Sequence, residues 1–280
     1  MIRRDVQLAD GSPGWALISQ IEHARLSEQL AAHCVGRFSS PELSDVRREV
    51  LAAILLHDDG WVDWERAPRF DPQLGRPLSF MELNACDAIE IWTMSIVVAE
   101  DEGLLAAWMV AGHFARLADK SEHARQDAHA AEWRAAAQLA REECLASWQA
   151  IDPMRHTREV AEEALQWLWT FDEVSLWICC NCPVGGEVRP SANQTTRTGR
   201  NTPLEMELVA TGAGVVDDPT RGLAAAKPWR FDAEAIDLQA ATRIVPAVRY
   251  DNAPALFAAS HPQTLRWRLA KKSPSLEGRG

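Results

Sequence analysis

Histidine and aspartate interrupt several apolar helical faces in the N-terminal part of the chain. At 100° per residue, Leu26, Leu30 and Cys34 lie within about 60° of His23, which places this histidine on the inward face of an expected helix. A polar or charged group in such a position is costly unless it has a partner, and one metal ion satisfies several such groups at once. We therefore expect helices that converge on one polar centre. The residues in such positions, on separate expected helices, are His23, His57 with Asp58, His113 and Asp172.

Capping signals predict the limits of these helices. Ser19 with Glu22, and Ser79 with Glu82, have the spacing of a capping box, in which side chains satisfy free backbone groups at a helix start. Gly60 is expected to end a helix, because glycine accepts the left-handed conformation found there. With the apolar periodicity, these signals predict helices over residues 19–34, 40–60, 79–99, 104–118, 122–150 and 157–179.

The composition changes after Pro183. Residues 183–202 are rich in Gly, Ser, Thr, Asn and Arg, which is typical of a flexible connection. Beyond them, apolar residues alternate with polar ones, as expected for strands, and a short strand is also expected near residues 15–18. Pro246 should place its strand at a sheet edge or in a bulge. The expected class is mainly α, with a helical part over 1–182, a connection over 183–202, a small antiparallel β-rich extension packed on the helices over 203–270 and a disordered tail over 271–280.

Charge and apolar run length exclude two classes of partner. The chain has 29 Lys+Arg against 40 Asp+Glu and a formal net charge of −11, so no general field attracts nucleic acid. The longest aliphatic run, over residues 51–56, is far shorter than the roughly 20 residues that span a bilayer. We expect a cytoplasmic protein that binds a small molecule, with no nucleic-acid or membrane partner. Its oligomeric state stays open.

Four segments resemble known families. The stretch LAAILLHDDG at residues 51–60 resembles the signature helix of the HD superfamily of metal-dependent phosphohydrolases, whose ligands come in the order His, His-Asp, Asp. Here that order falls on His23, His57-Asp58 and Asp172. The segments HARLSEQLA, HDDGWVDWERAP, GHF and FDEVSLWIC together resemble an uncharacterised bacterial family with HD-like helices, over nearly the whole chain. The resemblance implies an HD-like helical bundle, a metal and a hydrolytic reaction.

The further histidines favour one ion rather than two. His113 is the additional ligand candidate between the doublet and the final aspartate. His123 and His129 lie about 120° apart on their helix and cannot both face one site, and His33 lies about 80° from the His23 face. Nitrogen and oxygen ligands without thiolate favour a divalent transition metal, namely Mn, Fe, Ni, Co or Zn.

Residues next to the His-Asp doublet are candidates for catalysis and substrate binding. Asp59 or Glu65 could act as base or orient a metal-activated water, while Trp61 and Trp64 could form walls of a substrate pocket. The expected function is hydrolysis of a small phosphorylated metabolite or nucleotide, with Arg197 and Arg200 as candidate phosphate contacts.

Three other functions stay open from the sequence. An HD-type diiron oxygenase would use the same ligand order and would hold two iron atoms. A metal-binding sensor would hold the ion without turnover. A structural or interaction protein would keep these residues as a hydrogen-bonded core network and would contain no metal.

Overall fold

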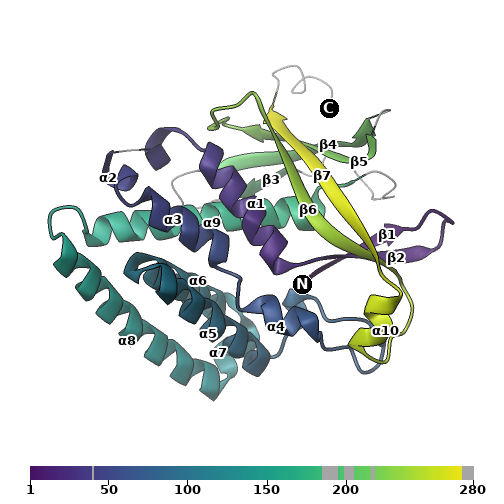
Figure 1. The fold of residues 1–280 in the computed structure, drawn as a ribbon, viewed down its shortest axis with the longest axis horizontal. Coiled ribbons are helices and arrows are strands. Elements are labelled where there is room, and N and C mark those ends of the chain that lie inside the picture. The colour runs from purple at the N-terminus through teal and green to yellow at the C-terminus, as the bar shows by residue number, and fades with distance from the viewer. Residues whose placement is uncertain (40, 185–194, 199–204, 216–217, 273–280) are drawn as a thin grey trace.

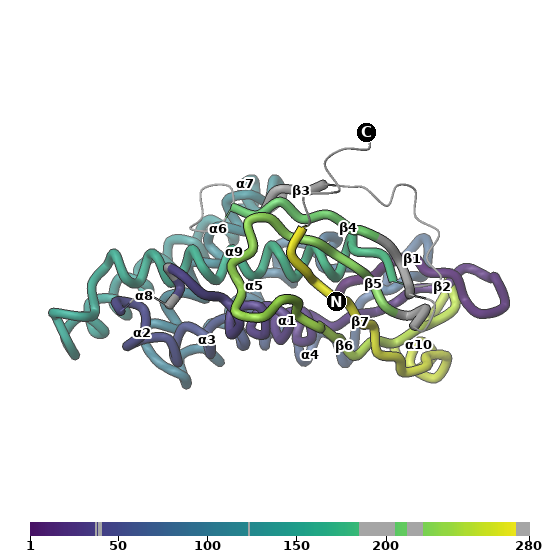
Figure 2. Tube along the Cα trace, turned by 90° about the horizontal axis from the view of Figure 1, so that it is seen from above, coloured from purple at the N-terminus to yellow at the C-terminus, as the bar shows by residue number. Residues whose placement is uncertain are grey.

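The computed structural model describes residues 1–39, 41–184, 195–198, 205–215 and 218–272. Within these ranges, helices form one end of the molecule and a curled sheet forms the other (Figure 1). Seen from above, strands of the sheet run across part of the helical region (Figure 2).

One mixed sheet contains all the named strands of the described residues. The strand order is β1-β2-β6-β7-β5-β4-β3, and neighbouring strands are antiparallel except for β5 and β7, which are parallel. The strands are β1 (Ile2–Gln7), β2 (Pro13–Ile18), β3 (Thr195–Thr198), β4 (Met206–Val215), β5 (Asp218–Lys227), β6 (Ala235–Pro246) and β7 (His261–Lys271).

The expected mainly α class with a small C-terminal antiparallel sheet is wrong, because the fold is mixed α/β. The N-terminal hairpin of β1 and β2 joins the sheet through β2, whose Leu17 pairs with Arg243 of β6. Strand β1 escaped the sequence analysis because its IRRDVQ sequence contains three charged residues and no clear apolar alternation. Pro246 is the last residue of β6, an interior strand, so the edge or bulge expected there is also wrong: at a strand end proline need not continue the ladder.

Several helices are shorter than expected because local caps divide them. The capping box of Ser79 and Glu82 is present, but it caps a 3-10 turn, Phe80–Glu82, and a new helix starts after Asn84. Asp127 accepts a hydrogen bond from the backbone of Ala130 and starts a second helix inside the range expected to be continuous. The helices are α1 (Gln20–His33), α2 (Pro41–Ser44), α3 (Arg47–Leu56), α4 (Trp61–Arg66), α5 (Ala85–Glu102), α6 (Leu104–Lys120), α7 (Glu122–Gln126), α8 (Ala128–Ile151), α9 (Arg158–Asn181) and α10 (Ala253–Ala258).

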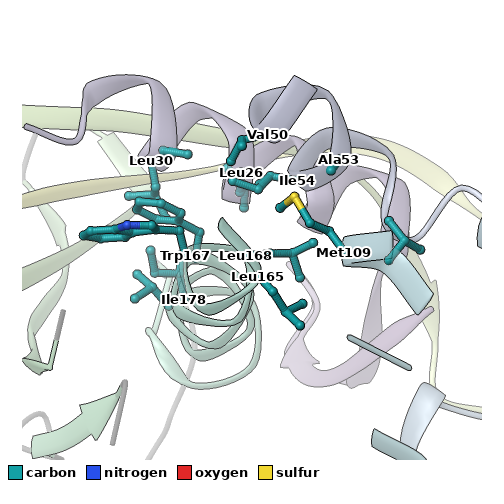
Figure 3. Packing of buried hydrophobic residues seen from close by; sticks show 14 of the residues in the cluster. Leu26, Leu30, Val50, Ala53, Ile54, Met109, Leu165, Trp167, Leu168 and Ile178 are labelled. Carbon is teal, nitrogen blue, oxygen red and sulfur yellow. The ribbon is translucent and has the colours of Figure 1, made fainter. Parts of the chain in front are cut away.

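The apolar core lies around α9. Helix α9 contacts α1, α3 and α6 on the bundle side and β1 and β3 on the sheet side. Apolar side chains from α1, α3 and α6 meet those of α9 in one cluster (Figure 3). Because these four helices share a core, their inward polar residues are brought to the same region. The labelled residues of this packing are Leu26, Leu30, Val50, Ala53, Ile54, Met109, Leu165, Trp167, Leu168 and Ile178.

The expected connection and tail lie mostly outside the described residues. Of residues 183–202, the structure describes 183–184 and the strand β3. Of residues 271–280, it describes Lys271, which ends β7, and Lys272. Among the described helices, none combines the length and the apolar character needed to cross a bilayer.

Candidate metal centre

Histidine and aspartate side chains from α1, α6, α9 and the end of α3 meet inside the bundle. His23 Nε2 lies 3.0 Å from Asp172 Oδ1 and 3.7 Å from Asp58 Oδ2. The ring of His57 contacts the ring of His113, and their centroids are 5.2 Å apart. All of these side chains are buried. We refer to His23, His57, Asp58, His113 and Asp172 as the His/Asp cluster.

The His/Asp cluster contains two overlapping groups that could hold a metal ion. One group is His23, His57 and Asp58, and the other is His57, His113 and Asp172. In each group, one nitrogen or oxygen atom per residue lies within 4.8 Å of those of the other two. His57 belongs to both groups and lies at the centre of the cluster.

Backbone geometry fixes the orientation of His57. This residue is the C-cap of α3, and its Nδ1–H donates to the carbonyl oxygen of Ile54 at 2.7 Å. A carbonyl oxygen only accepts, so the proton is on Nδ1 and the neutral ring has its lone pair on Nε2. Nε2 lies 3.4 Å from both Asp58 Oδ2 and Asp172 Oδ1 and makes no hydrogen bond to any described residue. A proton or a metal ion must therefore separate this lone pair from the two carboxylates.

A pair of serines orients His23 in the same way. His23 Nδ1 lies 2.8 Å from Ser175 Oγ, which also donates to the backbone carbonyl of Asp172 at 3.0 Å. Ser27 Oγ lies 2.6 Å from Ser175 Oγ and donates to the carbonyl of His23 at 3.2 Å. The Asp172 carboxylate only accepts, so without a metal it takes a hydrogen bond from His23 Nε2–H at 3.0 Å. A metal ion on Nε2 would displace that proton and leave a neutral ring with the proton on Nδ1, which would donate to Ser175 Oγ.

Ser175→Ala should weaken metal binding while the fold is retained. The substitution removes the acceptor of His23 Nδ1–H, and loss of such a partner of a metal-binding histidine costs about 10–100-fold in affinity. Competition with a chelating dye measures this affinity. Ser27→Ala is the matched control, because Ser27 makes no hydrogen bond to the His23 ring, and it should change the affinity less. Equal affinities for Ser175→Ala and the unchanged protein would contradict the assigned role.

The separations within the His/Asp cluster fit the first shell of a metal ion. Ligand atoms about 2.1 Å from one ion lie about 3.0 Å apart at right angles and about 3.4 Å apart at tetrahedral angles. The nitrogen–oxygen distances among His23, His57, Asp58 and Asp172 are 3.0, 3.4, 3.4 and 3.7 Å. The unpartnered buried nitrogens, His57 Nε2 and His113 Nδ1, also indicate a group that binds imidazole. The residues present thus fit a metal ion bound by nitrogen and oxygen.

The electrostatics of the cluster favour a cation. Burial lowers the pKa of His57, but the charges of Asp58 and Asp172 outweigh it and raise this pKa to about 9. Burial raises the pKa of Asp172, but the neighbouring His23 and His57 outweigh it and hold this pKa well below the usual range. Burial lowers the pKa of His113 to about 3, so its ring is neutral. Without a metal, a proton on His57 balances the charge of the two carboxylates. A metal ion would have to displace it, and binding should weaken as the pH falls.

One side of the His/Asp cluster opens on a cavity of about 530 Å³, which we call the cluster cavity. His23, Asp58, His113 and Asp172 line one end of it. Its walls are mostly apolar and aromatic, and polar side chains of α1, α6 and the N-cap of α5, Asn84, reach it. The residues that line it away from the cluster include Gln20, Trp61, Phe80, Asn84, Trp92, Phe114, Leu117 and Lys120.

The residues expected to assist catalysis lie in different places. Trp61 is buried and lines the cluster cavity, whereas Trp64 packs edge-on against Trp61 with ring centroids 5.3 Å apart and is not among the described lining residues. Asp59 and Glu65 are not among them either. Glu65 accepts from the backbone of Gln20 at 2.8 Å and pairs with the Met1 amine at 3.0 Å, which anchors α4 to the start of α1. A catalytic role for Asp59 or Glu65 stays a prediction.

The remaining sequence candidates lie away from the cluster or outside the described residues. His33 pairs with Asp232 at 2.8 Å, and His129 is exposed on α8. The side chains of His123 and Arg197 and the whole of Arg200 lie outside what the structure describes.

The sequence analysis missed the residues that support the ligands. Ser27 follows His23 by four positions and Ser175 follows Asp172 by three, so each shares the inward face of its ligand. A polar residue at this spacing from a buried ligand is a usable signal. Lys120 follows His113 by seven positions, or about two helical turns, so it also lies on the helix face of its ligand. Trp92 and Asn84 gave no signal, because only the packing of α5 brings them to the cavity.

Comparison with known proteins gives a family but no activity. A family model described as protein of unknown function (DUF3891) matches residues 1–247, a range that includes the whole His/Asp cluster. No curated protein and no solved structure matches the chain. The resemblance to an uncharacterised family is thus confirmed, whereas none of these comparisons links the chain to the HD superfamily.

Proposed function

The chain belongs to the DUF3891 family, whose description names no activity, and on that premise we propose that it is a metal-dependent hydrolase of a small phosphorylated metabolite or nucleotide. The observation that supports this most is that a buried His/Asp cluster with metal-ligand separations lines one end of a cavity large enough for a small molecule. The order of His23, His57-Asp58 and Asp172 also resembles the ligand order of the HD superfamily.

The metal ligands and the cavity walls would have separate roles in this reaction. A bound divalent transition metal (Mn, Fe, Ni, Co or Zn) would supply an activated water and polarise a phosphoryl oxygen. His57 and His23 would present Nε2 to it, held by Ile54 and Ser175, while Asp58 and Asp172 would offset its charge. The apolar walls of the cluster cavity would exclude bulk water and so strengthen these interactions.

A panel of phosphomonoesters assayed across pH tests this proposal. We expect turnover that depends on added metal and rises with pH through the pKa of the nucleophilic water, which lies near about 7 in such sites. The rise has this sign because the deprotonated water is the nucleophile. Asp172→Asn should lose the activity, whereas His129→Ala, on the exposed face of α8, should keep it. Metal-loaded protein that is inert on the panel between about pH 6 and 9 would contradict hydrolysis.

The number of ligands supports a second candidate, an HD-type diiron oxygenase. The two groups together offer three histidines and two aspartates, and a carboxylate can bridge two ions, whereas the single free lone pair of His57 Nε2 can bind only one of them. Elemental analysis of freshly purified protein separates the candidates. One ion per chain agrees with the hydrolase, and two iron atoms with a visible absorption band agree with the oxygenase. Bound metal without turnover would indicate a sensor, and metal-free protein whose stability is unchanged by chelators would indicate a structural network.

A further inference from the structure

The cluster cavity extends along one face of α6. His113 and Lys120 are seven residues apart, so they lie within about 20° of the same helix face and about 10 Å apart along the axis. Both line the cavity, and Leu117 lines it between them. The cavity therefore has a metal-binding end at His113 and a second polar end at Lys120.

The charge of the lining differs between the two ends. Among the described lining residues, Lys120 is the one lysine or arginine, and the carboxylates, Asp58 and Asp172, both lie at the other end. The acid next to it in the sequence, Asp119, is paired with Arg134 at 2.8 Å, and within the described part of the chain the Lys120 ammonium has no partner of its own. A divalent ion would offset both carboxylates, which leaves one positive charge at Lys120. This cavity would therefore favour anions, in contrast to the chain as a whole, whose formal net charge is −11.

The walls between the two ends are apolar and include flat rings. Trp92 and Phe114 stack with centroids 5.7 Å apart and planes at 20°, and Phe80 and Leu117 line the same space. Walls of this kind bind an apolar or aromatic body, because water leaves both surfaces when they meet.

We infer that the ligand of the cluster cavity is an elongated molecule with two anionic groups about 10 Å apart, joined by an apolar or aromatic body. One anionic group lies at the His/Asp cluster and the second at Lys120. The identification of the first group as a phosphate rests on the proposed function. The second group, a carboxylate or a phosphate, rests on the position and charge of Lys120.

Two non-hydrolysable probes of equal size test the second anion. The first is 4′-carboxybiphenyl-4-phosphonate, whose acidic groups are about 10 Å apart, and the second is the neutral-ended 4′-carboxamide. Isothermal calorimetry on the full chain supplemented with Mn²⁺ measures both affinities. We expect the carboxylate to bind about fivefold more tightly, as for a partly exposed ion pair.

Variants at Lys120 test whether its charge causes the tighter binding of the carboxylate probe. Lys120→Gln should remove the preference and leave binding of the carboxamide unchanged, and Lys120→Arg should keep it. Lys271→Gln, the same charge change at the exposed end of β7, is the matched control and should behave as the unchanged protein. Equal affinity for the two probes, a preference that survives in Lys120→Gln, or no binding of either probe would each overturn the inference.

These outcomes are distinct from failure of the proposed function. If the protein hydrolyses no phosphoester but shows the Lys120-dependent preference, the result supports the anion site and contradicts the proposed hydrolase function. Hydrolysis of phosphoesters by a protein without the preference would overturn the anion site alone.

Discussion

His57→Ala should abolish stoichiometric metal binding while helix content is retained. His57 belongs to both possible ligand groups, so its removal takes a ligand from each. Loss of an outer partner of a ligand already costs about 10–100-fold in affinity, and loss of the ligand itself should exceed about 100-fold. Elemental analysis of the purified variant should give less than about a tenth of the metal of the unchanged protein. Asp58→Ala takes a ligand from one group only, so it should lower the metal content less than His57→Ala does.

Two controls keep this result interpretable. Circular dichroism should show the helices of both variants, because the apolar core around α9 does not include His57. His129→Ala removes an exposed histidine from α8 and should leave the metal content unchanged. Equal metal in the unchanged protein and in His57→Ala would overturn the assignment of the His/Asp cluster as the metal site.

Gly60→Ala should destabilise the protein by about 3 kcal/mol or more. A Cβ at this position would overlap the carbonyl oxygen of Ile91 and lie 2.6 Å from the backbone nitrogen of Ser95. These are backbone atoms of α5, so they yield only if the helix or the turn that carries Asp58 moves. The Gly60 N–H also donates to Ser95 Oγ at 3.0 Å, and this hydrogen bond would be lost with the displacement. Urea denaturation of metal-free protein measures the free energy of unfolding.

Gly36→Ala separates crowding from backbone strain. Gly36 has φ +84°, and a Cβ added there would meet no atom of the described residues beyond its chain neighbours within 4 Å. Its substitution therefore costs only the left-handed conformation, about 1 kcal/mol. Gly60 has φ −61°, which alanine adopts without strain, so any loss there comes from crowding. A Gly60→Ala protein as stable as the unchanged one would show that the turn is not held against α5.

The sequence identified much of the cluster because burial of polar groups leaves a local signal. A histidine or aspartate at the centre of an apolar helical stripe must have a partner, whatever the fold, and His23, His113 and Asp172 stood out for this reason. The position of His57 at the end of α3 followed from the same periodicity. The metal-binding role of these residues stays a prediction until metal is measured, but the geometry brings all of them together.

Packing between distant segments decided the rest. Gly60 was expected to supply a left-handed cap, and instead its missing side chain lets α5 approach the turn after Asp58. Glu65 is close to the doublet in sequence but lies against the start of α1.

By itself, the sequence determined which side chains face inward and that the buried polar residues need a common partner, because side-chain direction in a helix repeats with a period fixed by the backbone. Only the tertiary structure decided the class of the fold and the shape of the cavity. Pairing of β2 with β6 joins residues more than two hundred positions apart, and no local periodicity encodes which strand a segment will meet.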